Sequence, residues 1–363
     1  MIDISDISSL FPAASLQNIK NDIAQAEKQG KLTNKQIQTI QEHGLLKAMV
    51  PGQYGGKQMS LPELLKIEEA LAYIDGSLGW TVTLCSGAGW FGGFLNEEIA
   101  AEFLSASNTC IAGSGFMGGT AEMTANGYVI NGKWSYASGA NMATAFTANC
   151  LVTKNKVAVK NEDGTDKILS FIFHSNEVTL LDDWNAFGMV ATASHSFEAK
   201  ELEVSANRSF SMNAQPVVNA ALYHFPFMQL AECTLSVNII GMALHFMELC
   251  STMIDGKKLT NSVTELQDKY NGMLNKLQTS RQKLFYAVDM AWQVCQANKE
   301  ISPSLLYKVT AASAIAVSVA KDCVNTLYPH CGLKAADKRS EINRVWRDIQ
   351  TAGQHGMIVS LAD

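Results

Sequence analysis

The sequence is short of charged residues, which make up only 17% of its 363 positions, against roughly a quarter in typical soluble domains. The net charge is −6, and the basic residues form no cluster along the chain. Nucleic-acid binding needs a clustered basic surface, so this class of function is excluded. Together with a hydrophobic content of 47%, the low charge predicts extra buried surface, which a helical homo-oligomer would provide.

The sequence also lacks the patterns of a metal site, a signal peptide and a membrane span. The eight cysteines form no CxxC pair and no zinc-ligand spacing, so we expect no metal site and a reduced, cytoplasmic protein with cysteines in its core. The first 16 residues have acids and no basic start, which is not the pattern of a signal peptide. No uncharged apolar run reaches about 18 residues, so no membrane span is expected.

What is present divides the chain into three segments. Residues 1–108 show helical periodicity, residues 109–210 show short β-type runs, and residues 211–363 return to long helices. We therefore predict an α+β, mainly helical fold with an N-terminal helical domain, a middle antiparallel β domain and a C-terminal four-helix bundle.

The helical segments have recognisable limits. Asn34 is expected to cap a helix that ends before Gly44, and a second helix is expected over residues 61–73. The four bundle helices are predicted at residues 227–253, 262–297, 303–327 and 342–361. On a regular final helix, Arg344, Asp348 and His355 would share one face.

The middle segment has turn signals between its predicted strands. Asn126-Gly127 and Asn131-Gly132 suit tight hairpin turns. Strands are predicted at residues 109–112, 128–130, 146–153, 168–173 and 197–204, and residues 113–120 (GSGFMGGT) as a loop. That loop lacks the lysine and following helix of a phosphate-binding loop, and no GxGxxG follows a strand, so a Rossmann site is not expected.

Two regions now point to a family. Residues 44–56 (GLLKAMVPGQYGG) and 67–80 (IEEALAYIDGSLGW) resemble the N-terminal domain of the acyl-CoA dehydrogenase superfamily. Residues 128–139 (YVINGKWSYASG) resemble its β-domain signature, which leads to a strand against the flavin ring. The resemblance covers nearly the whole chain and implies the fold predicted above, with a bound flavin.

Within the superfamily, the chain is most similar to the two-component flavin-dependent monooxygenases. GKWSYASG resembles their GRWxFxSG. Residues 184–195 (WNAFGMVATASH) are similar to their W-x-x-x-G-M/L-x-G-T-G-S-x-D, with Ala191 and Ala193 in place of glycines. Residues 344–357 (RVWRDIQTAGQHGM) resemble their R-x-W-R-D-x-x-x-x-x-x-H helix. The resemblance implies an enzyme that uses reduced FMN or FAD from a separate reductase, with O2, to oxygenate a small organic substrate.

The resemblance also implies site residues. His355 is the expected acid or base, because imidazole can do either near neutral pH, and Ser138 is expected to hydrogen-bond near flavin N5. The expected flavin contacts are Ser138, Thr192, Ser194, Trp134 and Arg281, and the expected substrate contacts are Phe116, Met117, Trp90 and His224. His195 is expected at a strand end facing solvent.

Two other functions stay open. An acyl-CoA dehydrogenase or related oxidase would use FAD and a carboxylate base. The glutamate of the family's Y-E-G-T segment falls here at Gly356, but Glu232 lies near a second position used in the family. A non-catalytic scaffold that has lost flavin is the other alternative. Many relatives carry a phenol-binding histidine near Trp90, and residues 86–89 (SGAG) contain none, which argues against a phenolic substrate. The family's habit of assembly implies a homotetramer.

Overall fold

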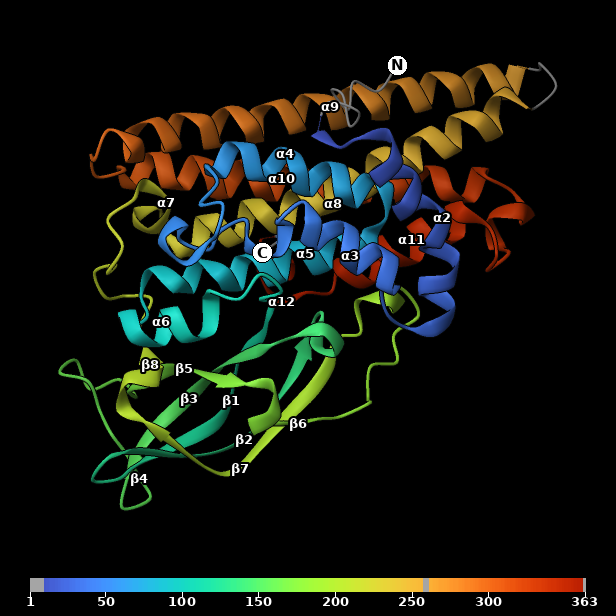
Figure 1. The fold of residues 1–363 in the computed structure, drawn as a ribbon. Helices are drawn as coiled ribbons and strands as arrows, with labels where there is room; N and C mark the ends of the chain where they lie inside the picture. Colours follow the sequence, from blue (N-terminus) through green and yellow to red (C-terminus); the bar gives the residue numbers. More distant parts are fainter. Residues whose placement is uncertain (1–9, 257–260, 362–363) are drawn as a thin grey trace.

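The computed structural model describes residues 10–256 and 261–361, so the first nine residues of the segment tested for a signal peptide lie outside it. Long helices stack in layers, and one sheet lies beneath them (Figure 1). This arrangement is the mainly helical acyl-CoA dehydrogenase-like architecture that was predicted. The described part of the chain carries apolar clusters in the N-terminal helices, in the sheet and in the large helical layer.

The N-terminal helices are α2 (Ala13–Gln29), α3 (Asn34–Glu42), α4 (Leu61–Ile74), α5 (Gly76–Gly89) and α6 (Glu97–Leu104), with short 3-10 turns between them. The cap of α3 is Thr33 and not Asn34 as predicted, because the Thr33 side chain accepts from Gln36 N and the Gln36 side chain accepts from Thr33 N. Asp75 starts α5 by accepting from Leu78 N at 2.8 Å. Most of α5 is buried, and it packs against α4, α8 and β1.

The sheet contains eight strands: β1 (Ile111–Met123), β2 (Gly127–Ala137), β3 (Ala145–Lys154), β4 (Val157–Ala158), β5 (Ile168–His174), β6 (Thr179–Leu180), β7 (His195–Ser205) and β8 (Ser209–Phe210). Their order is β6-β7-β2-β1-β3-β5-β8, with β4 on β3. Only the β1–β3 pairing is parallel, so the mostly antiparallel sheet is confirmed.

Two details of the β prediction were wrong. Residues 113–120 belong to strand β1 and not to a loop, although the β1–β3 register shifts between Ser114 and Gly119. Asn131-Gly132 lies inside β2, at a register shift against β7, because a bulge takes up the glycine there. The turn that joins β1 to β2 is the one at Gly127, whose carbonyl accepts from Thr124 N at 2.9 Å.

The C-terminal helices are α7 (Ala221–His224), α8 (Phe227–Asp255), α9 (Asn261–Gln296), α10 (Pro303–Leu327), α11 (Glu341–Ala352) and α12 (Gly356–Ser360). The predicted helix at 342–361 is therefore two helices, because α11 ends at Ala352 with Gly353 as its C-cap, and His355 precedes α12 as its N-cap residue. The expectation that Arg344, Asp348 and His355 share a regular helical face was wrong.

Among the described residues, two helices are long and apolar enough to cross a membrane by length and composition alone, although charged residues interrupt both. They are Phe227–Asp255 and Pro303–His330. The apolar window of the first is 67% buried inside the protein. Both pack in the helical layer, where α8 contacts α4, α10 and α11 and where α10 also contacts α9. Burial in the bundle accounts for the composition of the first helix. The apolar window of the second is only 28% buried and packs on α8 and α9 along one side.

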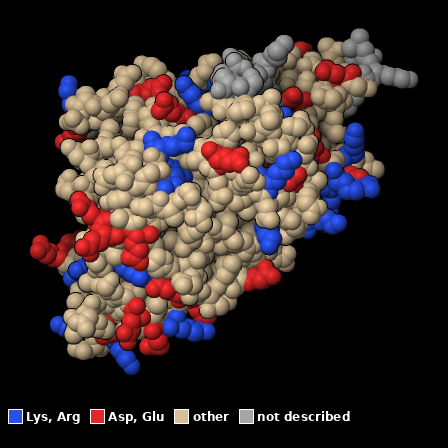
Figure 2. All heavy atoms as spheres, in the orientation of Figure 1, with Lys and Arg blue, Asp and Glu red and all other residues tan. Residues whose placement is uncertain are grey.

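The surface agrees with the sparse charge of the sequence. On the face in Figure 2, charged side chains are separated by larger uncharged areas, with several acidic side chains toward the left edge and several basic ones toward the right. All eight cysteines are buried, as predicted.

Candidate active site

One edge of the sheet meets helix α5, and most of the expected flavin contacts gather there. Ala137 at the end of β2 pairs with His195 at the start of β7. Since β1 runs antiparallel to β2, its first half also lies toward this edge. The Cys85 thiol of α5 contacts the Ser138 carbonyl at 3.5 Å. The edge is therefore the end of β2 fixed against α5.

Three side-chain hydroxyls form a chain at this edge. Ser138 Oγ lies 2.9 Å from Ser194 Oγ, and Ser194 Oγ lies 2.6 Å from Thr192 Oγ1. Thr192 Oγ1 donates to the Met189 carbonyl at 2.8 Å, and Gly139 N donates to the Thr192 carbonyl at 2.8 Å. All three hydroxyl residues are buried. The structure thus brings together three of the residues that sequence predicted.

His195 anchors the segment that leads into this chain. Its Nδ1 accepts from Asp183 N and from Trp184 N, both at 3.1 Å, and its side chain is buried. The expectation of a solvent-facing histidine was wrong, because the ring is needed to satisfy two backbone N–H groups. The Trp184 indole then donates to the Met189 carbonyl at 3.1 Å.

Helix α11 clamps the same segment through the Arg347-Asp348 pair. Arg347 Nη1 donates to the Phe187 carbonyl at 2.5 Å, and its Nη2 contacts the Glu27 carboxylate of α2. Asp348 Oδ1 accepts from Met189 N at 2.5 Å. Gly188 is required between them, since a Cβ there would lie 2.0 Å from the Arg347 carbonyl. The conspicuous R-x-W-R-D sequence therefore holds residues 187–189.

Asp348 lies in a charged but buried setting. Burial, with the nearby Asp75 carboxylate, raises the pKa of Asp348 to about 7, although the Met189 N–H bond and the charges of Arg344 and Arg347 favour the ionised form. In either protonation state its oxygen can accept from Met189 N, so the clamp works on both sides of neutrality.

His355 lies on another side of α5. Its ring meets the Trp80 indole edge-on, with centroids 5.6 Å apart. Its Nδ1 is buried and has no hydrogen-bond partner in the described part of the chain. Burial lowers the pKa of His355, so the ring is neutral at pH 7. A neutral imidazole with an unused nitrogen can take or relay a proton.

Trp134 was the wrong aromatic residue to assign to flavin. Its side chain is fully buried in the sheet, stacked on Phe197 and donating to the Asn149 carbonyl. Tyr136, two residues later, is 71% exposed at the same sheet edge and packs edge-on against Trp184. The register shift before Ala137 and a φ of 67° at Tyr136 turn its ring outward. The aromatic position in the matched GRWxFxSG pattern was the signal for Tyr136.

Of the four expected substrate contacts, two are available to a ligand at the sheet and two are not. Phe116 and Met117 are exposed on β1, at 68% and 45%, so both are available to a ligand. Trp90 is buried and donates to the Leu222 carbonyl at 2.8 Å, which makes it a packing residue. His224 is exposed and bonded to Asn219, on a helix that packs against α9 and the turn Trp90–Gly93. We therefore remove Trp90 and His224 from the site.

Arg281 has a partner within the chain. Its guanidinium makes two 2.6 Å hydrogen bonds to the Glu69 carboxylate. Glu69 is buried on α4, and burial raises its pKa while Arg281 opposes that rise. Moving Arg281 to a flavin phosphate would leave a buried acid without its cation, which is costly. The expected flavin contact of Arg281 is therefore corrected to an ion pair between α4 and α9.

The carboxylate of the dehydrogenase alternative faces another helix. Glu232 is buried on α8 and accepts from Thr310 of α10 at 2.5 Å. Asn238 of the same helix donates to Thr83 of α5 at 2.8 Å. Six residues at about 100° each separate the two side chains by roughly 120° around α8. Glu232 thus points toward α10, while Asn238 points toward α5.

A further buried carboxyl was not found from sequence. Glu68 of α4 is fully buried, and neither of its oxygens has a hydrogen-bond partner among the described residues. Burial raises its pKa well above the usual range, against the weak pull of Thr83 and Ser86 beside it. At about 100° per residue, Thr83 lies roughly 160° and Ser86 roughly 100° around α5 from Cys85, which contacts the sheet edge. Glu68 therefore lies away from the hydroxyl chain.

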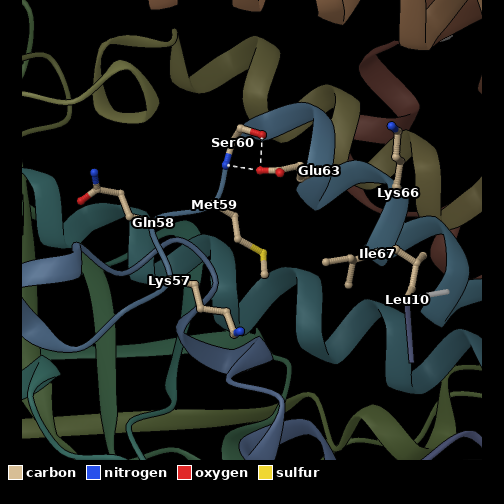
Figure 3. A pocket seen from close by; sticks show the side chains of 8 residues that line it. All are labelled: Leu10, Lys57, Gln58, Met59, Ser60, Glu63, Lys66 and Ile67. Carbon is tan, nitrogen blue, oxygen red and sulfur yellow. Dashed lines mark hydrogen bonds between the residues drawn. The ribbon is translucent and has the colours of Figure 1, made fainter. Parts of the chain in front are cut away.

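Two hollows differ in their relation to this edge. A cleft of about 90 Å³ is lined by Thr81, Gly139, Thr192, Ala193 and neighbours from α3. A larger groove of about 590 Å³ lies at the start of α4, where Ser60 bonds Glu63 and Lys57 and Lys66 line the walls (Figure 3). The larger groove shares no lining residue with the hydroxyl chain, while the smaller cleft borders the chain at Thr192.

Ala193 offers a stability test of this turn. It has a φ of 47°, and the matched family pattern has glycine there. Left-handed backbone costs a residue with a Cβ about 1 kcal/mol, so Ala193→Gly should raise the free energy of unfolding by roughly 0.5–1 kcal/mol. Denaturant unfolding measures this change. Ala191→Gly is the matched control and should lower stability by a similar amount, because Ala191 has no positive φ. Loss of stability in both variants would contradict the argument.

The edge fits a reduced flavin. The ring system is planar and carries an N5–H when reduced. Tyr136 offers exposed and Trp184 partly exposed aromatic surface beside a buried hydroxyl chain. Gly139 allows the close approach of α5, since a Cβ there would lie 2.7 Å from the Cys85 sulfur. Ser138 and Tyr136 would hold the cofactor, which would supply the oxygen chemistry. The buried Thr192 and Ser194, expected as flavin contacts, lie behind Ser138 in the hydroxyl chain.

Comparisons with known proteins agree with the fold. Residues 13–109 match the family model "Acyl-CoA dehydrogenase, N-terminal domain" and residues 233–360 match "Acyl-CoA dehydrogenase, C-terminal domain". The chain is 22% identical to indole-3-acetate monooxygenase of Pseudomonas putida, over 93% of this chain and 86% of the relative.

Two further proteins resemble the chain in sequence or structure. The oxygenase subunit HsaA, a flavin-dependent monooxygenase of Mycobacterium tuberculosis, is 21% identical over 94% of this chain and 89% of its own. XiaF from Streptomyces sp., solved with FADH2 and glycerol, superposes with a TM-score of 0.85 at 17% identity, covering 95% of this chain and 89% of XiaF. With both family models matched and the fold shared, the chain belongs to the acyl-CoA dehydrogenase superfamily.

Proposed function

We propose that the protein is a flavin-dependent monooxygenase that uses reduced FMN or FAD and O2 to oxygenate a small organic substrate. One observation carries the choice over a dehydrogenase: Glu232, the carboxylate expected to act as base, is bonded to Thr310 of α10, while the neutral imidazole of His355 keeps an unpartnered nitrogen beside α5. Among the residues that the structure describes, Glu68 is also unpartnered beside α5, but burial raises its pKa well above the usual range, which favours the neutral acid over a carboxylate base. A dehydrogenase needs a carboxylate base near its substrate, and a monooxygenase needs a proton donor or acceptor. The relatives with monooxygenase names support the same choice.

The residues divide the work. Ser138 would accept from N5–H of reduced flavin, which keeps that proton in place. The aromatic surface of Tyr136 and Trp184 would exclude water from the ring. Phe116 and Met117 would cover the substrate, and His355 would move a proton as oxygen transfers. These roles make Ser138 and His355 the catalytic residues of the proposal.

The test is binding followed by oxygenation. Photoreduced FMN or FAD is titrated anaerobically, and each oxidised form is titrated in parallel. We expect the reduced form to bind more tightly. Oxygen is then added with indole-3-acetate, the compound in the name of the Pseudomonas relative. Full occupancy by copurified FAD that an acyl-CoA reduces would establish the dehydrogenase instead, and binding of neither form would establish a scaffold.

Ser138→Ala should weaken reduced-flavin binding by no more than the worth of one hydrogen bond and should send more of the consumed oxygen into hydrogen peroxide. One neutral hydrogen bond is worth about 0.5–1.5 kcal/mol, roughly twofold to tenfold in rate. Stopped-flow oxidation and a peroxide assay measure the effect. Thr153→Val is the control, because its hydroxyl bonds Glu122 at the other end of the sheet. Equal peroxide yields in wild type and Ser138→Ala would remove Ser138 from the proposal.

We also propose a homotetramer. Large apolar side chains are exposed on α9 and α10, which pack together: Tyr286, Met290, Tyr307 and Ile315. Light scattering should give four times the chain mass of 39.4 kDa. Changing Tyr307 and Ile315 together to Glu should lower the oligomeric state, and changing exposed Leu333 to Glu should not. A wild-type monomer at micromolar concentration would contradict the proposal.

The remaining assignments follow from the oxygenase role. A separate flavin reductase would supply the cofactor, as the name "oxygenase subunit" indicates for HsaA. The lack of a histidine in residues 86–89 favours a non-phenolic substrate. The buried cysteines support a cytoplasmic location. Domain boundaries at 1–108, 109–210 and 211–363 complete the proposal, and limited proteolysis at their junctions tests them.

A further inference from the structure

The hydrogen bonds of the hydroxyl chain at the sheet edge can have only one donor-to-acceptor direction. The chain ends on the Met189 carbonyl, which can accept but not donate. The Thr192 hydroxyl therefore donates its single proton to the Met189 carbonyl. Its oxygen can then only accept from the Ser194 hydroxyl, 2.6 Å away. Because Ser194 donates its own proton to Thr192, the Ser138 hydroxyl must donate to the Ser194 oxygen, 2.9 Å away. What is left at Ser138 is a hydroxyl oxygen that can only accept.

The anchor of this chain is itself fixed. Asp348 holds Met189 N at 2.5 Å, and the Trp184 indole and Thr192 N also donate to the Met189 carbonyl, at 3.1 Å and 3.2 Å. The positive φ of Ala193 folds residues 192 and 194 toward each other, so that two hydroxyls which a regular strand would hold about 7 Å apart come into contact. Helix α11 thus sets the polarity at Ser138 through residues that do not touch the cofactor.

We propose that Thr192 and Ser194 are positioning residues that make the site prefer reduced over oxidised flavin. Reduced flavin presents N5–H, a donor, and oxidised flavin presents a bare N5, an acceptor. An accept-only Ser138 matches the first and opposes the second. This inference rests on the proposed function, because it assumes that flavin N5 meets Ser138. It adds the origin of the redox preference and the residues that set it.

The test is a variant in which the donor-to-acceptor direction of the hydroxyl chain is no longer determined by the Met189 carbonyl. In Thr192→Val, Ser194 keeps its proton, so Ser138 is free to donate to oxidised N5. We expect oxidised flavin to bind roughly threefold to tenfold more tightly than in wild type, the worth of one neutral hydrogen bond, while reduced-flavin affinity changes little. A tenfold loss of preference would lower the two-electron potential of bound flavin by about 30 mV. A residue that merely supported the fold would weaken both forms alike.

Controls separate the outcomes. Thr192→Ser keeps the hydroxyl and should retain the wild-type ratio of dissociation constants. Ser194→Ala breaks the chain by deleting one oxygen atom, should behave like Thr192→Val, and serves if the valine variant unfolds. The constants are measured by anaerobic fluorescence titration of FMN and FAD. If wild type shows no preference for reduced flavin, the proposed function fails. If wild type shows it and both Thr192→Val and Ser194→Ala keep it, the positioning role is overturned.

Discussion

Replacing His355 with alanine should slow product formation by about 10²–10⁴-fold, the usual worth of a positioned acid or base. Reduced-flavin affinity should change little, because the ring lies against Trp80 of α5 and not in the hydroxyl chain. Oxygen consumption should continue, so the variant should release hydrogen peroxide in place of product. Product and peroxide yields per reduced flavin measure the effect, with indole-3-acetate as the trial substrate.

The pH dependence gives an independent check. Burial lowers the pKa of His355, so if the neutral ring acts as base, wild-type activity should persist below pH 6.5 and fall only at more acidic pH. His43→Gln is a control on a histidine of the N-terminal helices that bonds Ser15, and it should leave the product-to-peroxide ratio unchanged. Normal coupling in His355→Ala would make His355 a packing residue and remove it from the site.

Arg347→Leu should cost about 3–5 kcal/mol of unfolding free energy, as expected when one partner of a buried charge network is removed. The variant leaves the Phe187 carbonyl and the Glu27 carboxylate without their shared donor. Flavin affinity should fall as well, because residues 187–189 would lose half of their clamp while Asp348 still holds Met189 N. Denaturant unfolding and reduced-flavin titration measure the two effects.

Arg339→Leu is the matched control. Arg339 also binds an aspartate, Asp337, but its side chain is 90% exposed. Exposed ion pairs contribute about 0–1 kcal/mol, so this variant should be nearly neutral in stability and in flavin affinity. If Arg347→Leu is no more harmful than Arg339→Leu, the R-x-W-R-D sequence does not act as the clamp that its contacts indicate.

Several features of the protein were predictable from local sequence. The helix of residues 303–327 has the predicted limits, because apolar periodicity and the Ser302-Pro303 start are local signals. The grouping of Ser138, Thr192 and Ser194 followed from short segments that resemble the family. Such segments carry their own geometry, since neighbouring residues determine how a strand ends and turns.

Backbone irregularities of two or three residues made predictions of side-chain facing from sequence periodicity wrong. Trp134 and Tyr136 have strand spacing and would share a face, yet a register shift and a positive φ bury one ring and expose the other. His355 would continue a helix, yet α11 ends at Ala352. Periodicity assumes a regular element, so a bulge or helix end reverses the facing of every residue beyond it.

By itself the sequence determined the order of helices and strands, the family and the hydroxyls at the sheet edge. Only the tertiary structure decided which polar side chains were available for chemistry. Arg281 binds Glu69 from 212 positions away, Glu232 binds Thr310, and His355 keeps an unpartnered nitrogen. The physical reason is that a polar group's role depends on the partner that satisfies it when buried, and that partner is chosen by the packing of distant helices.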